Sequence, residues 1–129
     1  MVCYAGDAMD SKACILVADD SAVIHEVLTT LLDDEGYRTV EAANGRDALD
    51  LALSQHVDLI VLDLEMPLLN GHAFCAAYRE HGGQAPVLLL TGSSPGAVAA
   101  AIDSCGAVGF IPKPFELDEV LTSVERHLG

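Results

Sequence analysis

The sequence of 129 residues contains no tryptophan, and aromatic side chains make up only 5% of it. Basic residues are also scarce: six lysines and arginines stand against 20 aspartates and glutamates, giving a formal net charge of −14. A surface of that sign repels phosphate backbones and anionic lipid headgroups, which argues against direct nucleic-acid or membrane binding. The longest apolar runs are far shorter than the roughly 20 residues needed to span a bilayer.

Signals for secretion are missing too. The N-terminus has no basic stretch followed by an apolar one, and the four cysteines form no CxxC pair. We therefore expect reduced thiols and a cytoplasmic location. Residues 1–12 show no periodicity and are predicted to form a disordered tail, while 13–129 form one domain.

Short apolar runs and helical patterns alternate along residues 13–129. Ser21 and Asn44 are expected to cap helices, and Gly36 and Gly106 to end them. The apolar runs predict strands at 14–18, 37–42, 57–62, 87–90 and 108–111. The periodic segments predict helices that follow these strands, at 22–35, 45–54, 71–81, 95–105 and 117–128. This alternation indicates the α/β class: a single doubly wound, five-stranded parallel sheet with five helices.

Polar residues stand where the predicted strands end. Asp19 and Asp20 follow the first strand, Asp63 the third, Thr91 the fourth and Lys113 the fifth. Ligands of open parallel sheets bind outside the carboxyl ends of the strands, so these side chains should meet at one edge. Three carboxylates favour a hard cation such as Mg²⁺, and the hydroxyl and ammonium groups suit phosphoryl oxygens. Together they predict a phosphoryl-transfer site with a carboxylate acceptor.

The same residues lie in motifs that resemble the receiver domain of bacterial two-component response regulators. The motifs are the acid pair at 19–20, DLEMPLLNG at 63–71, TG at 91–92 and FIPKPF at 110–115. The resemblance covers nearly all of 13–128 and implies a flavodoxin-like (βα)5 receiver fold, either stand-alone or excised from a longer protein.

The resemblance also implies roles for individual residues. Asp63 would be phosphorylated by a sensor histidine kinase or a histidine phosphotransfer protein. Asp19, Asp20 and Asp63 would bind Mg²⁺ together with the backbone carbonyl of Glu65.

The remaining motif residues would bind the phosphoryl group and transmit its presence. Lys113 and Thr91 would contact the phosphoryl oxygens, and Thr91 and Phe110 would act as switch residues. Two positions depart from the family pattern: Phe110 replaces a common tyrosine, and Pro112 replaces a common hydroxylated residue. These departures concern the signalling mechanics rather than the phosphorylation.

The resulting hypothesis is a phosphorelay signalling receiver that catalyses only its own phosphorylation and dephosphorylation and is otherwise not an enzyme. One alternative is a Mg²⁺-dependent phosphohydrolase with an aspartyl-phosphate intermediate, because Glu65 supplies a second acid two residues after Asp63. The other is a receiver-like interaction module that is never phosphorylated.

The expected output surface is the 95–115 face together with the last helix. Helix 95–105 has a single charged residue, Asp103, so part of it should be an apolar patch for a downstream effector protein or a homodimer. The five histidines lack ligand-like spacing and are interpreted as solvated or helix-flanking, and the cysteines as core or surface thiols.

Overall fold

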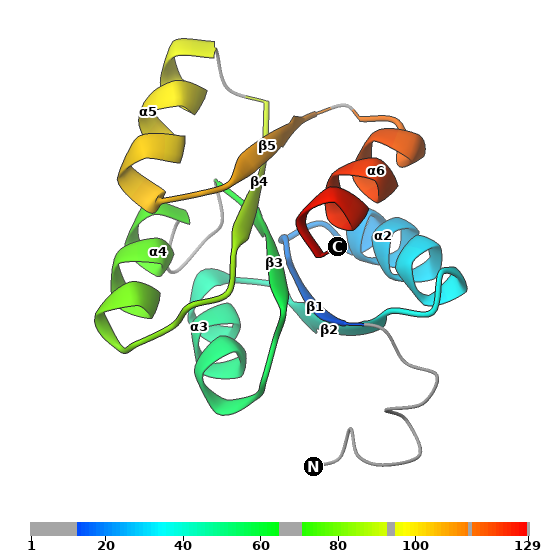
Figure 1. The fold of residues 1–129 in the computed structure, drawn as a ribbon, viewed down its shortest axis with the longest axis horizontal. Helices are drawn as coiled ribbons and strands as arrows, with labels where there is room; N and C mark the ends of the chain where they lie inside the picture. Colours follow the sequence, from blue (N-terminus) through cyan, green and yellow to red (C-terminus); the bar gives the residue numbers. More distant parts are fainter. Residues whose placement is uncertain (1–12, 65–70, 93–94, 114, 129) are drawn as a thin grey trace.

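The structure of the chain is a computed structural model. It describes residues 13–64, 71–92, 95–113 and 115–128. The disordered tail predicted at 1–12 and the ligand role predicted for Glu65 lie outside these residues. Strands and helices alternate from end to end (Figure 1). In chain order they are β1 (Cys14–Ala18), α2 (Ala22–Asp34), β2 (Arg38–Ala42), α3 (Gly45–Ser54), β3 (Leu59–Asp63), α4 (Gly71–Glu80), β4 (Val87–Thr91), α5 (Pro95–Cys105), β5 (Gly109–Pro112) and α6 (Leu117–Leu128).

The strands form one parallel sheet in the order β2-β1-β3-β4-β5. The chain leaves β1 toward one edge of the sheet and returns to β3 on its other side, so the order reverses between β1 and β3. A crevice for ligands forms at such a switch point, outside the carboxyl ends of the strands. The predicted doubly wound fold is confirmed.

The sheet carries a hydrophobic layer on each face. Helices α2 and α6 cover one face, and α3, α4 and α5 cover the other (Figure 1). Strands β1, β3 and β4 are buried at every position, and their sequences are apolar rather than alternating up to the polar last residues of β3 and β4, Asp63 and Thr91. None of the described helices has the length and apolarity that crossing a bilayer requires.

The predicted helix ends are observed. The Ser21 side chain accepts a hydrogen bond from the backbone N–H of Ile24, and Asn44 accepts one from Asp47. Gly106 follows α5 with a φ of 66°, a conformation that glycine adopts without steric cost.

Several boundaries and faces differ from the sequence prediction. Pairing of β2 begins at Arg38, because the backbone N–H of Tyr37 still bonds to Leu32 at the end of α2. Strand β5 begins at Gly109, one residue after Val108. Leu53 follows the helical pattern of α3 yet is 42% exposed, because the described elements leave that side of the helix uncovered.

Candidate functional site

Asp19 lies immediately after β1 and is completely buried. Its backbone N–H donates to the carbonyl of Ala42 at 3.1 Å, which holds it against the end of β2. Its Oδ1 accepts a hydrogen bond from the backbone N–H of Ser21 at 2.8 Å, at the start of α2. The carboxylate is therefore held in one position, and its Oδ2 pairs with a side chain at the end of β5.

Asp63, the last residue of β3, lies beside Asp19 because β1 and β3 are adjacent strands. It is 3% exposed, whereas Asp20 is exposed to solvent. Each of Asp19, Asp20 and Asp63 offers a carboxylate oxygen, and these oxygens all lie within 4.8 Å of one another. Asp63 and the adjacent pair Asp19 and Asp20, far apart in the chain, are thus brought to one point, as the sequence predicts.

Lys113 supplies a positive charge at this cluster. Its Nζ lies 3.0 Å from Oδ2 of Asp19 and 3.5 Å from Oδ2 of Asp63. Its backbone N–H donates to the carbonyl of Thr91 at 2.9 Å, which continues the pairing of β5 with β4. Burial alone would lower the pKa of the Lys113 ammonium, but its hydrogen bond to Asp19 and the charges of both acids hold that pKa above the ordinary value.

Thr91 ends β4 and is 1% exposed, at the same edge of the sheet as Asp63. Among the described residues that Gly92 does not adjoin in the chain, the nearest atom to a Cβ at this position would be the carbonyl oxygen of Lys113, at 3.9 Å. Phe110 is 44% exposed on β5 and lies outside the cluster.

The donor set fits a hard divalent cation. All the side-chain donors in the cluster are carboxylate oxygens, the ligands that Mg²⁺ prefers, and one of them is open to solvent. The single ammonium of Lys113 does not balance three carboxylates, so a further cation would reduce their mutual repulsion. The residues present are therefore compatible with the predicted magnesium site.

His25 differs from the sequence prediction of a solvated or helix-flanking histidine. It is only 9% exposed, and its Nδ1 lies 3.2 Å from Oε1 of Glu41. Its Nε2 is buried without a hydrogen-bond partner. The spacing of α2 alone could not reveal this, because the contact depends on how α2 packs beside β2.

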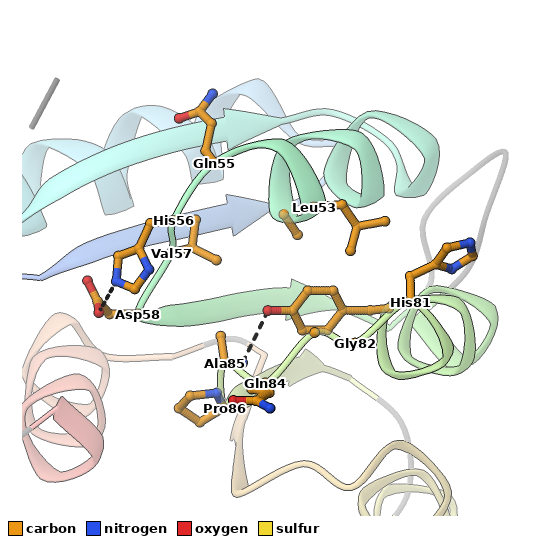
Figure 2. Close-up of a pocket in the computed structure, with 13 residues that line it drawn as sticks. Leu53, Gln55, His56, Val57, Asp58, His81, Gly82, Gln84, Ala85 and Pro86 are labelled. Atoms are coloured by element: carbon orange, nitrogen blue, oxygen red, sulfur yellow. Dashed lines mark hydrogen bonds and ion pairs between the residues drawn. The ribbon is translucent and has the colours of Figure 1, made fainter. Parts of the chain in front are cut away.

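A cavity of about 490 Å³ lies at the opposite end of the sheet, before the amino ends of β3 and β4 (Figure 2). Figure 2 shows His56 directed at Asp58, with Nε2 2.9 Å from Oδ1. Open parallel sheets place their ligands at the other end, so this cavity is separate from the carboxylate cluster.

Known proteins are similar to this chain in both sequence and fold. The sequence model of the response regulator receiver domain matches residues 15–125. The chain belongs to the response regulator receiver family. Among curated receivers, it is 40% identical to the response regulator MprA of Mycolicibacterium vanbaalenii over 88% of this chain and 49% of that protein. It is 35% identical to the regulatory protein AtoC of Escherichia coli over 88% of this chain and 25% of that protein.

Solved receiver structures have the same fold. The receiver domain of the Francisella response regulator 1452 superposes with a TM-score of 0.85 at 30% identity, covering 91% of this chain and 97% of that one. The receiver domain of the sensor histidine kinase PA1611 from Pseudomonas aeruginosa, solved with magnesium in its active-site cleft, gives 0.84 at 26% identity, covering 92% and 99%.

The predicted family, fold and signalling class are thus confirmed. The chain spans about half the length of the MprA relative and a quarter of AtoC. Receiver family membership identifies a two-component signalling domain, while the roles of individual site residues remain predictions.

Proposed function

We propose that this receiver accepts a phosphoryl group on Asp63 in a Mg²⁺-dependent reaction. The observation that carries the proposal is the convergence of Asp63 with two further acids and Lys113 at the switch point of the sheet. Asp63 is the member of the cluster that lies on a central strand between Asp19 and Thr91, where a bound phosphoryl group would reach both neighbours. A carboxylate in this setting is a suitable nucleophile toward phosphohistidine.

The reaction is a transfer between two side chains. A carboxylate oxygen of Asp63 forms a bond to phosphorus while the bond from phosphorus to the imidazole nitrogen of the donor breaks. Lys113 stabilises negative charge on the phosphoryl oxygens, and the Thr91 hydroxyl donates a hydrogen bond to one of them.

Asp19, Asp20, Asp63 and the carbonyl of Glu65 would hold Mg²⁺, which when bound neutralises charge between the carboxylates and the phosphoryl oxygens. Attack of water on the phosphorus breaks its bond to the Asp63 oxygen, which releases inorganic phosphate and returns Asp63 to its free carboxylate. The domain thus catalyses only its own phosphorylation and dephosphorylation, and a screen of phosphomonoesters for turnover separates this from a phosphohydrolase.

The proposed reaction implies two kinds of protein partner. A sensor histidine kinase or a histidine phosphotransfer protein supplies the phosphoryl group in the cytoplasm. The output surface consists of the 95–115 face and α6, where Val108, Phe110 and Leu117 are each 44–45% exposed. On α5, Ala97, Ala99 and Ala100 are also exposed. An effector protein or a second copy of the domain binds there, and phosphorylation shifts a pre-existing equilibrium that controls this binding.

The test is phosphorylation with acetyl phosphate and Mg²⁺, followed by intact-mass analysis. Wild type should gain one acid-labile phosphoryl group, and Asp63→Asn should gain none. Asp58→Asn is the matched control, since it removes the same charge near the opposite end of β3 and keeps an oxygen that can accept the Cys14 N–H.

Full phosphorylation of the Asp63→Asn protein would rule out Asp63 as the acceptor. An equal loss of phosphorylation in Asp63→Asn and Asp58→Asn would rule it out as well. The Lys113→Ala protein should still gain the phosphoryl group, but its conformational response to phosphorylation should be weak.

A further inference from the structure

Two buried cysteines meet where α5 packs on α4. Cys75 lies in the second turn of α4 and is 1% exposed; Cys105 is the last residue of α5 and is 2% exposed. The Sγ of Cys105 lies 3.9 Å from the carbonyl oxygen of Gly71, one helical turn before Cys75. This contact places the Cys105 thiol beside the turn of α4 that ends at Cys75.

We propose that Cys75 and Cys105 are a disulfide-forming pair whose oxidation locks α5 onto α4. A disulfide has an S–S bond of about 2.05 Å, so the two sulfur atoms must come into bonding contact when the link forms. Both residues belong to the hydrophobic cluster on the face of the sheet that α3, α4 and α5 cover. The bond would therefore form within this buried cluster.

The chemistry requires an oxidant, and hydrogen peroxide is the class that suits an intracellular thiol pair. One thiol, as its thiolate, attacks a peroxide oxygen, giving a sulfenic acid and releasing water after proton transfer. The second thiolate then attacks the sulfenic sulfur and displaces a second water molecule. The peroxide is reduced to two water molecules, and the two thiols are oxidised to one disulfide.

The closed fold protects the pair. Burial, together with the neighbouring Cys105 thiol, raises the pKa of the Cys75 thiol, and a protonated, inaccessible thiol reacts slowly. Oxidation therefore requires α5 to separate from α4 for a time.

Helix α5 is suited to such an opening. Its buried side chains among the described positions are Val98, Ala101 and Cys105, whereas α4 buries Phe74 and Tyr78. Fewer apolar contacts give a smaller free energy of local opening. Figure 1 shows the end of α5 beside the start of α4, above the other helices on this face of the sheet. The disulfide would therefore restrain the helix that carries the proposed output surface.

The first experiment treats the protein with hydrogen peroxide in a Cys3→Ser background, then blocks free thiols and maps peptides. The expected product is an intramolecular disulfide between Cys75 and Cys105, with Cys14 still a free thiol. The product should melt roughly 5 to 10 °C higher than the reduced form, because the link restricts the unfolded chain. Cys75→Ala and Cys105→Ala should each abolish this shift.

The second experiment tests the opening of α5 with a matched pair of substitutions. Val98→Ala weakens the contacts of α5, and Val124→Ala makes the same change on α6, where the side chain is also buried. Disulfide formation should be about tenfold faster in Val98→Ala and should change less than about twofold in Val124→Ala.

Either of two results would overturn the proposal. One is peptide maps in which Cys75 and Cys105 stay reduced while Cys14 or intermolecular links are oxidised. The other is equal acceleration by both valine substitutions, because oxidation would then follow global unfolding rather than opening of α5.

Discussion

The two ends of the sheet use the same kind of residue for different purposes. At the amino end, the carboxylate of Asp58 accepts a hydrogen bond from the Cys14 N–H at 2.9 Å and lies 2.9 Å from His56. At the carboxyl end, Asp19 and Asp63 lie beside each other and share one ammonium. An acid whose oxygens meet donors stabilises a fold, whereas acids held together retain repulsion that a ligand can relieve.

Other polar groups at the amino end also meet hydrogen-bond partners within the fold. The hydroxyl of Tyr78 accepts a hydrogen bond from the backbone N–H of Ala85 at 3.1 Å. The guanidinium of Arg79 donates to the carbonyls of Gly83 and Ala85 at 3.1 and 3.0 Å. These contacts close the turn between α4 and β4 beside the cavity of Figure 2. The amino end thus holds the fold, and the carboxyl end carries the charges that phosphorylation is proposed to use.

The largest expected effect on stability is that of Lys113→Ala. Removing the ammonium leaves two buried carboxylates facing each other, which should cost about 2 to 3 kcal/mol of unfolding free energy without Mg²⁺. Mg²⁺ should then restore more stability than it adds to wild type. Urea unfolding with and without Mg²⁺ measures both quantities, and an unchanged metal-free midpoint would mean that Lys113 does not compensate the acids.

At the amino end, Tyr78→Phe should cost about 1 to 2 kcal/mol, because the buried N–H of Ala85 loses its acceptor. Labelling by acetyl phosphate should remain at the wild-type level. Thermal unfolding and intact-mass analysis provide the two readouts. A loss of labelling in this variant would show that the two ends of the sheet are not independent.

Magnesium should stabilise the wild-type fold by mass action. At about tenfold excess over its dissociation constant the gain is roughly 1.4 kcal/mol, or about 3 to 5 °C in Tm. Without metal, Asp63→Asn should melt no lower than wild type, because one repulsive charge is gone, and it should gain less from Mg²⁺. Asp58→Asn should keep the full gain. A sharply lower Tm for Asp63→Asn with an undiminished Mg²⁺ response would show that the three acids do not act as one site.

The smallest effect is a change of environment rather than of stability. A phosphoryl mimic at Asp63 should shift the amide resonances of 95–115, including Phe110, while those near Asp58 and Ala85 stay in place. Two-dimensional NMR of labelled protein gives this comparison directly. Unmoved resonances throughout 95–115 would exclude that face as the output surface.

Much of this protein is determined by its sequence alone. Apolar runs of strand length, each followed by a helical pattern, are enough to specify the parallel sheet. Because every strand of such a sheet ends at the same edge, the positions of Asp19, Asp63, Thr91 and Lys113 in the sequence already predict that they meet. The caps at Ser21 and Asn44 were predictable for a similar reason, since capping depends on residues three positions apart.

Tertiary structure decided the contacts between elements that are distant in the chain. Helical periodicity treats Val23 and Leu28 alike, yet Val23 is 69% exposed and Leu28 is fully buried, because burial depends on which neighbour covers each side. The pairing of His25 with Glu41 and the meeting of Cys75 with Cys105 have the same origin. Local sequence determines whether a segment forms a strand or a helix. Side-chain contacts between distant elements depend instead on the register and packing of the whole sheet, which no single segment encodes.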